Sequence, residues 1–215
     1  MAVVRLDHVS YAAGPDGLAA AVQRIGSMLG AGLDDGGLHP RFGTRNFTLP
    51  LAGGTYLEVV GALDHPATDK EPFGQAVKRR GAEGGGWMGW VVAVDDINDV
   101  EQRLGRPAVP GNRHRPDGHE LHWRQIGVRD LMADPALPFF VQWLGDSSDH
   151  PSAGASPSIG IERLEICGDP AALSRWLGEP ASHPLERVAV DWVSAEGPGL
   201  VAVHFATAHG SVRID

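Results

Sequence analysis

The order of secondary structure predicted for the first 64 residues returns after residue 86, and this repeat restricts the fold more than any single motif. In the first copy a strand, a helix and a two-stranded hairpin are predicted over 3–12, 16–29, 41–51 and 55–60, with a short strand before the hairpin near 33–38. In the second copy a strand, a helix and two strands are predicted over 87–95, 97–104, 120–128 and 138–144. Both copies end alike, in Glu58-Val-Val-Gly and Gln142-Trp-Leu-Gly, each followed by His-Pro. Two βαβββ modules are therefore predicted, over about 3–64 and 86–151, with a helix near 75–80 between them.

A third, shorter series of elements follows a linker rich in Ser, Pro and Gly at 147–158. It comprises a strand, a helix and three strands over 159–167, 170–177, 185–193, 199–206 and 211–214. The chain is accordingly divided into a domain over 1–152 and a smaller βαβββ-like unit over 158–215.

Composition and charge exclude several classes of protein. A hydrophobic content of 42% over 215 residues is enough for a buried core. The net charge of −9 with only 18 Lys and Arg argues against nucleic acid as a partner. No run approaches the roughly 18 apolar residues that cross a bilayer, and the first strand does not resemble a signal peptide. With Cys167 as its single cysteine, the chain is expected to be cytoplasmic, without a membrane or disulfide role.

Three segments resemble the glyoxalase-like branch of the vicinal oxygen chelate (glyoxalase/bleomycin resistance/extradiol dioxygenase) superfamily. They are Leu6-Asp7-His8-Val9-Ser10-Tyr11, Thr55-Tyr56-Leu57-Glu58-Val59-Val60 and Trp90-Val-Val-Ala-Val-Asp95-Asp96. The resemblance extends from Val3 to about Pro151. It implies an α+β fold in which tandem βαβββ modules form a half-open mixed-sheet barrel, with the C-terminal unit as a third, smaller βαβββ-like addition. It also implies a divalent metal inside the barrel, held by residues from the first and last strands of the modules.

Strand alternation predicts which side chains of the first module face the inside of the barrel. We assume that apolar side chains face the covering helices. The inward set is then His8 and Ser10 from the first strand, Thr44, Asn46 and Thr48 from the hairpin's first strand, and Tyr56, Glu58 and Val60 from its second. His8 and Glu58 are thus predicted to converge.

The same assumption gives a different inward set for the second module. Leu121, Trp123, Phe139, Val141 and Trp143 would pack outward, which turns His122, Arg124, Phe140 and Gln142 inward. The position that corresponds to His8 would be Gly89 or Trp90, and neither supplies a useful ligand.

The resemblance and these faces together predict the site residues. His8 and Glu58 are candidate metal ligands, completed by Gln142 or by His122, and Glu58 is also the candidate catalytic residue. Two histidines and one carboxylate would suit a divalent ion, with Zn, Fe, Mn and Ni left open. Asn46, Trp90, Arg124 and Phe140 are the candidate substrate-binding residues, because an apolar wall with a few placed polar groups is the common design of a pocket. Four His-Pro dipeptides, at His39, His65, His150 and His183, are interpreted as loop structure.

Two functions remain open from the sequence. The first is a metal-dependent lyase, isomerase or dioxygenase that acts on a small molecule. The second is a metal-free protein that binds or sequesters a small molecule in the same fold. The C-terminal unit adds a further alternative, in which it covers the site or pairs two copies into a homodimer.

Overall fold

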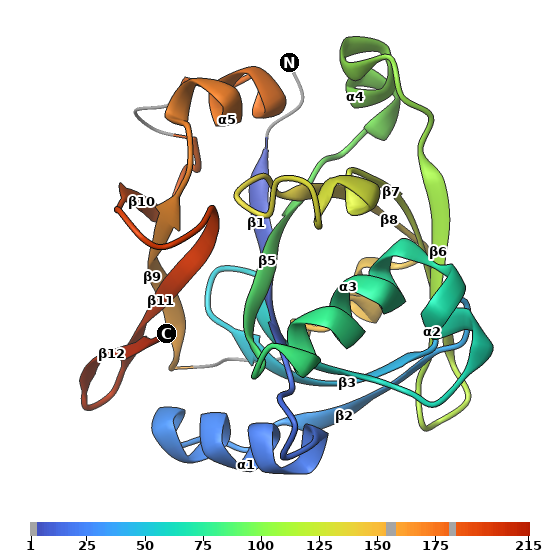
Figure 1. Cartoon of the computed structure of the whole chain (residues 1–215), viewed down its shortest axis with the longest axis vertical. Helices are drawn as coiled ribbons and strands as arrows, with labels where there is room; N and C mark the ends of the chain where they lie inside the picture. The colour runs from blue at the N-terminus through green and yellow to red at the C-terminus, as the bar shows by residue number, and fades with distance from the viewer. Residues whose placement is uncertain (1–3, 154–157, 181–183) are drawn as a thin grey trace.

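The computed structural model describes residues 4–153, 158–180 and 184–215, and its first eight strands close into one barrel (Figure 1). The first module consists of β1 (Arg5–Ala12), α1 (Leu18–Leu29), β2 (Asp34–His39), β3 (Thr44–Leu51) and β4 (Thr55–Ala62). The second consists of β5 (Gly86–Ala93), α4 (Ile97–Leu104), β6 (Val109–His114), β7 (Glu120–Ile126) and β8 (Phe139–Leu144). The strand order around the barrel is β1-β4-β3-β2-β6-β7-β8-β5. The predicted duplication is confirmed.

The two modules have the same strand pairing. In each, the first strand lies parallel to the last, β1 with β4 and β5 with β8, and the remaining pairs are antiparallel. β1 and β5 join the modules along one side. On the other side β2 and β6 meet through the single residue pair Leu38 and His114. This short seam closes the barrel that the resemblance implied to be half open.

The strand β6 was missed in the sequence. Its residues, Val-Pro-Gly-Asn-Arg-His, do not alternate in polarity, and Pro110 and Gly111 are both depleted in strands. Trp123 lies against Gly111, where a Cβ atom would clash with the indole. Glycine at this position therefore makes room for the indole of the neighbouring strand.

Two helices between the modules close one end of the barrel. They are α2 (Pro66–Lys70) and α3 (Pro72–Ala82), and in Figure 1 α3 crosses in front of the ring of strands. Phe73, Ala76 and Val77 of α3 are buried in one cluster with the inner-wall residues Val91 and Val141. This helix therefore forms part of the barrel's inner core. No helix in the described part of the chain is long and apolar enough to cross a membrane.

The C-terminal unit has the predicted order of elements but not the pairing of a module. It consists of β9 (Gly160–Cys167), α5 (Pro170–Leu177), β10 (Ala189–Trp192), β11 (Gly199–Thr207) and β12 (Gly210–Ile214). Two short 3-10 helices lie earlier in the chain, η1 (Val128–Asp130) before β8 and η2 (Ser147–Asp149) after it. The sheet order is β10-β9-β11-β12, and β9 lies parallel to the strand directly after its helix rather than to its last strand. It is thus a separate four-stranded sheet.

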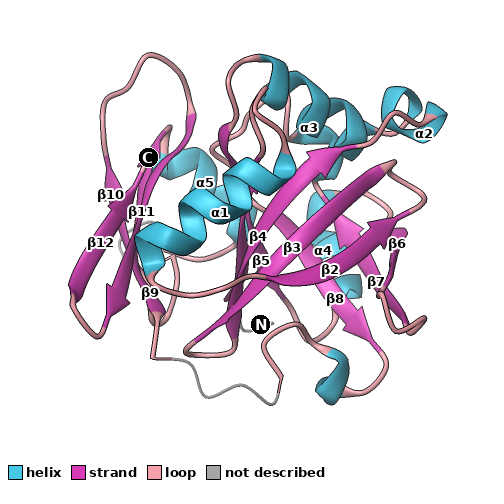
Figure 2. Cartoon of the chain, turned by 90° about the horizontal axis from the view of Figure 1, so that it is seen from below, coloured by secondary structure: helices cyan, strands magenta, loops and turns pink. Residues whose placement is uncertain are grey.

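This sheet packs beside the barrel, as Figures 1 and 2 both show. Trp87 of β5 stacks on Phe205 of β11, with ring centroids 6.3 Å apart, and its Nε1 donates to the carbonyl oxygen of Ile214 at 2.8 Å. Buried residues of α1, the barrel's outer face and the C-terminal sheet belong to one hydrophobic cluster. Burial of this shared apolar surface holds the two sheets together.

Candidate active site

A cavity lies inside the barrel, and the two modules line it with different side chains. The first module contributes His8, His39, Phe42, Tyr56 and Glu58. The second contributes Arg113, Trp123, Gln125, Phe139, Val141 and Trp143, and Phe73 of α3 completes the lining. The space free of atoms, open mouth included, is about 440 Å³. One wall is therefore rich in titratable groups, and the other is mainly aromatic and aliphatic.

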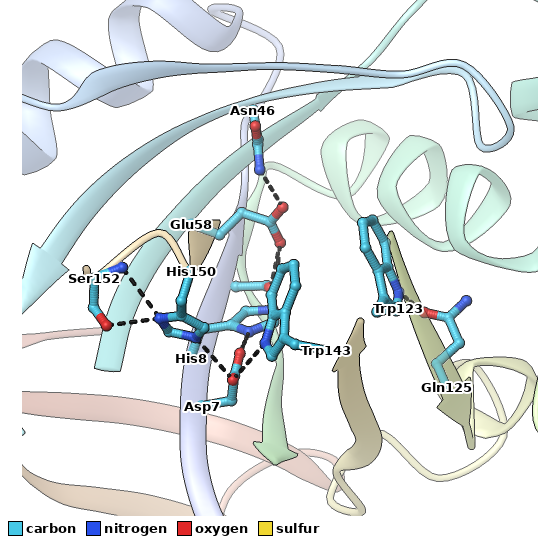
Figure 3. Close-up of polar contacts among 10 residues, drawn as sticks. Asp7, His8, Asn46, Glu58, Trp123, Gln125, Trp143, His150 and Ser152 are labelled. Carbon is cyan, nitrogen blue, oxygen red and sulfur yellow. Dashed lines mark hydrogen bonds and ion pairs between the residues drawn. The ribbon is translucent and has the colours of Figure 1, made fainter. Parts of the chain in front are cut away.

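Asp7 and His8 are neighbours in β1, yet both take part in the buried polar network of Figure 3. The pairing of β1 with β5 shifts register between Leu6 and His8. A bulge of this kind interrupts the alternation of faces and re-aims a side chain. Asp7 is 2% exposed, and its Oδ1 lies 2.6 Å from Nδ1 of His8. Simple alternation sends Asp7 outward, so the sequence prediction missed it, although a carboxylate between Leu6 and His8 in a buried strand is itself a signal.

The second oxygen of Asp7 is held by two further side chains from the end of the second module. Nε1 of Trp143 donates to Oδ2 at 2.9 Å, and Nε2 of His150 lies 3.1 Å from the same atom. Nδ1 of His150 is in turn 2.7 Å from Oγ of Ser152. The carboxylate is therefore fixed by three side-chain partners.

These contacts determine which nitrogen of His8 carries hydrogen. Burial would raise the pKa of Asp7, but the hydrogen bonds and charges of His150 and His8 outweigh it and hold this pKa well below its ordinary range. An ionised carboxylate only accepts hydrogen bonds, so Nδ1 of His8 is the donor in this pair. In the neutral imidazole the lone pair is then on Nε2. Tyr56 stacks on the same ring, with centroids 4.4 Å apart.

Glu58 is a buried and ionised carboxylate on the next strand. It is 4% exposed and accepts hydrogen bonds from Ser10 Oγ at 2.6 Å and from Asn46 Nδ2 at 2.7 Å. Burial would raise its pKa, but the charges of His8 and His39 and the two hydrogen bonds lower it below the usual value. Its Oε2 lies 3.9 Å from Nε2 of His8. The predicted convergence of His8 and Glu58 is confirmed as geometry, and Asn46, predicted to face inward, bonds to Glu58. The chemical roles of these residues remain predictions.

His39 lies in the cavity rather than in a loop, so that prediction was wrong. It is the last residue of β2, is 4% exposed, and its Nδ1 is 2.9 Å from Oγ1 of Thr44. Burial lowers its pKa to about 4, with Glu58 opposing and Arg113 and His8 adding to the shift. His39 is therefore neutral at pH 7. Of the other His-Pro dipeptides, His65 caps α2 and His183 lies outside the described residues.

The faces predicted for β7 are reversed in the structure. Trp123 lines the cavity, whereas the side chain of His122 is 54% exposed. Arg124 points outward and pairs with Glu101 of α4 at 3.0 Å. Our assumption that apolar side chains face only the covering helices fails here, because the inner wall of this module is itself apolar.

The faces predicted for β8 and β5 fail for the same reason. Phe139, Val141 and Trp143 line the cavity, and Phe140 packs in the outer core. Gln142 serves the adjacent helix: its Nε2 donates to the Asp95 carbonyl at 2.8 Å, and its Oε1 accepts from the Ile97 amide at 3.3 Å. Trp90 also lies in the outer core, where its Nε1 donates to the Ala136 carbonyl at 3.0 Å. The likeness between Glu58 and Gln142 is therefore one of sequence only.

The donor set does not fit the metal site that the resemblance implied. Of the four predicted ligands only His8 and Glu58 face the cavity, and the last strand of the second module contributes Phe139 and Val141 to its lining. Neither side chain can act as a metal ligand. In the ranges that the structure describes, no group of three or more His, Cys, Asp or Glu side chains is arranged to hold a metal ion.

Comparisons with known proteins agree with the fold. The sequence profile of the family described as "Glyoxalase-like domain" matches residues 6–181. A hypothetical protein from Staphylococcus aureus is similar in structure over 99% of this chain and 86% of its own, with 15% sequence identity and a TM-score of 0.62. Methylmalonyl-CoA epimerase from Mycobacterium tuberculosis is similar over 65% of this chain and 86% of its own, at 16% identity and a TM-score of 0.43. The Streptomyces coelicolor methylmalonyl-CoA epimerase in complex with 2-nitronate-propionyl-CoA is similar over 66% of this chain and 96% of its own, at 13% identity and a TM-score of 0.43. The search of curated proteins finds no match.

The profile match spans the whole barrel and continues past it into the C-terminal unit. The structure has the duplicated modules that the resemblance implied and the inward His8 and Glu58 that strand alternation predicted. The chain therefore belongs to the glyoxalase-like domain family.

Proposed function

We propose that the protein is an enzyme that moves a proton on a small organic molecule bound inside the barrel, with Nε2 of His8 as the base. The observation that carries the proposal is the 2.6 Å contact between Asp7 Oδ1 and His8 Nδ1. It orients the imidazole and leaves a lone pair on Nε2, which is how a carboxylate prepares a histidine base in many enzymes. Asp7 is then a positioning residue, and His8 is the catalytic residue.

The proposed step begins with a C–H bond made acidic by a neighbouring carbonyl group of the substrate. Nε2 of His8 takes the proton, and the electron pair stays on the substrate as an enolate. The imidazolium is stabilised by Asp7 at Nδ1 and by Glu58, whose Oε2 is 3.9 Å from Nε2. Return of the proton to a different atom of the enolate completes an isomerisation. In a lyase reaction the enolate electron pair instead forms a new C=C bond, and a group on the carbon β to the carbonyl departs with its bonding pair. No step passes through a metal, because the donor set described above does not fit one.

A second candidate is a binding protein without chemistry. The aromatic wall of Trp123, Phe139 and Trp143 supports it, since such surfaces hold apolar ligands. These are not the aromatic residues, Trp90 and Phe140, on which the sequence prediction relied.

Hydrogen exchange in the substrate separates the two candidates. We would incubate the protein with small carbonyl acids, such as pyruvate and acetoacetate, in D₂O with EDTA, and follow loss of the C–H signals by ¹H NMR. The enzyme hypothesis predicts exchange above the buffer rate, reduced about 10²- to 10⁴-fold in His8→Gln. The exposed His209→Gln is the control and should leave the rate unchanged. Binding without exchange in either the native protein or His8→Gln would favour the second candidate.

The state of His8 can be checked without a substrate. ¹⁵N-resolved NMR of the imidazole rings at pH 7 should show hydrogen on Nδ1 and a lone pair on Nε2. A ring with hydrogen on Nε2 alone would contradict the proposed base.

A further inference from the structure

A buried guanidinium in the cavity has no role in the proton transfer proposed above. Arg113 of β6 is 2% exposed and lines the cavity. An arginine is almost never fully buried unless its charge is paired, because removing the charge from water costs several kcal/mol. The surroundings of Arg113 therefore need an explanation.

The described residues provide no partner for this charge. No ion pair within 4.0 Å and no side-chain hydrogen bond joins Arg113 to another residue in the part of the chain that the structure describes, and its Nε is buried without a hydrogen bond. Arg124, one strand away on the outer face, has the ordinary arrangement, with bonds to Asn98 and Glu101 at 3.0 Å. Arg113 thus differs from its neighbour in being both buried and unpaired.

The position of Arg113 is at the seam between the two modules. Leu38 of β2 pairs with His114 of β6 in antiparallel register. His39 and Arg113 are the residues adjacent to this pair on the two strands, and both line the cavity. His39 is neutral at pH 7 and cannot neutralise the guanidinium. Burial lowers the pKa of Arg113, and Tyr56 and Glu58 oppose this shift from a distance. The charge therefore stays on the side chain and faces the cavity.

We infer that Arg113 binds the carboxylate of a small organic acid, whose apolar body lies against the aromatic residues Phe73, Trp123 and Phe139. A guanidinium presents parallel N–H donors that match a carboxylate, and a charge-assisted pair of this kind is strongest where water is excluded. A carboxylate fits this site better than inorganic phosphate, because the second module's side of the cavity, to which Arg113 belongs, is otherwise mainly aromatic and aliphatic and offers few donors for further oxygens. The inference deepens the proposed function, on which it rests for the reaction: the substrate would be a carboxylic acid, held by Arg113 while His8 removes its proton.

Benzoate is a suitable probe, since it combines a carboxylate with a small apolar body. Isothermal titration calorimetry at pH 7 should show benzoate binding to the native protein and at least about tenfold weaker binding of benzamide, the neutral analogue. Arg113→Met should weaken the binding of benzoate about 10- to 100-fold. Arg124→Met removes an arginine from the outer face and should leave benzoate affinity unchanged. Equal binding of benzoate and benzamide, or tighter binding of inorganic phosphate than of benzoate, would overturn the inference.

Thermal unfolding separates a binding arginine from a structural one. Because Arg113 has no partner among the residues that the structure describes, its replacement by Met should leave the melting temperature of the free protein unchanged or raise it. A lower melting temperature would mean that the guanidinium holds the fold, and would contradict the inference. Arg113→Lys keeps the charge but loses the paired donors, and should bind benzoate more weakly than the native protein while it remains folded.

The same experiment distinguishes failure of the inference from failure of the proposed function. His8→Gln removes the proposed base but not the guanidinium, so in this background Arg113→Met should still weaken benzoate binding about 10- to 100-fold. If the native protein binds benzoate through Arg113 but catalyses no proton exchange, the proposed function is contradicted and the carboxylate site is not. If the native protein catalyses proton exchange but does not bind benzoate, the carboxylate site is contradicted and the proposed function is not.

Discussion

The indole Nε1 of Trp143 donates a 2.9 Å hydrogen bond to Oδ2 of Asp7, across 136 positions of the chain. The two residues come from the last strand of the second module and the first strand of the first. The bond helps to fix the carboxylate that orients His8, so the candidate base depends on the contact between modules.

Replacement of this donor should lower the free energy of unfolding measurably. Trp143→Phe removes a hydrogen bond to a buried charged acceptor, and we expect a loss of about 1.5 to 3 kcal/mol in the free energy of unfolding. Trp176→Phe is a matched control, because its Nε1 donates at 2.7 Å to the neutral carbonyl of Pro138 and the same ring volume is lost. Urea unfolding followed by circular dichroism measures both. An equal loss in the two variants would mean that the charge of Asp7 does not matter.

His39 should make the stability depend on pH. Its pKa is about 4 in the folded protein, against an ordinary value of 6.5. Between these values the unfolded chain binds a proton that the folded protein does not, so the free energy of unfolding falls as the pH decreases from 6.5 toward 4. We expect a loss of about 2 kcal/mol from this residue between pH 7 and pH 5.

The variant His39→Gln should remove that part of the pH dependence, and urea unfolding at the two pH values measures it. The exposed His209→Gln should retain the native slope. A native slope in His39→Gln would show that His39 is protonated in the folded protein.

A second carboxylate beside Glu58 should be strongly unfavourable. Asn46→Asp keeps the shape of the side chain but places a like charge where Nδ2 now donates to Glu58 at 2.7 Å. Two carboxylates this close cannot both ionise, so one pKa rises, and we expect a loss of about 3 to 5 kcal/mol at pH 7. Since a raised pKa restores stability as the pH falls, the deficit relative to the native protein should shrink at pH 5.

The control for this variant is on the outer face of the barrel. Nδ2 of Asn112 donates to the exposed Glu120 at 2.6 Å, so Asn112→Asp creates the same pair in water. Chemical unfolding should show a much smaller loss there. Comparable losses at both positions would indicate that burial does not govern the effect.

The barrel seam should be sensitive to one glycine. Gly37 of β2 has φ +103°, and a Cβ atom there would clash with the backbone carbonyl of His114 in β6. Gly53→Ala is the control, with φ +80° but open space around it, and should cost about 1 to 2 kcal/mol. Gly37→Ala should cost more and should speed amide hydrogen exchange in β2 and β6, which carry His39 and Arg113. Unchanged exchange in these strands would mean that the single pair at the seam does not close the barrel.

Local pattern predicted much of the fold. The helix predicted over 170–177 is α5 with the same bounds, since a Pro at its first turn and a Gly at its end mark both termini. Most faces of the first module were also predicted correctly, Asp7 apart. His8, Tyr56 and Glu58 line the cavity, and Ser10 and Asn46 bond to Glu58. The apolar Leu49, Leu57 and Val59 belong to the same outer cluster as α1. Where one face of a strand is polar and the other apolar, alternation is enough to predict the direction of each side chain.

In the second module, alternation failed to predict the direction of the side chains. Trp123 and Phe139 are apolar and would be buried on either face, so their polarity carries no information about direction. Gln142 looked like a ligand by its place in the repeat, but it bonds to the backbone at the start of α4. An apolar side chain seeks burial, and only the assembled barrel decides between its inner and outer cores.

The amino-acid sequence by itself determined the duplicated modules, the family, and the convergence of His8 with Glu58, because these follow from short-range periodicity and repeated order. Tertiary structure alone decided the rest of the site. The bulge that turns Asp7 toward His8, the strand that brings Arg113 into the cavity, and the distant donors from Trp143 and His150 all depend on contacts between segments far apart in the chain. Hydrogen bonds and burial of this kind arise only when the barrel closes, so no local pattern encodes them.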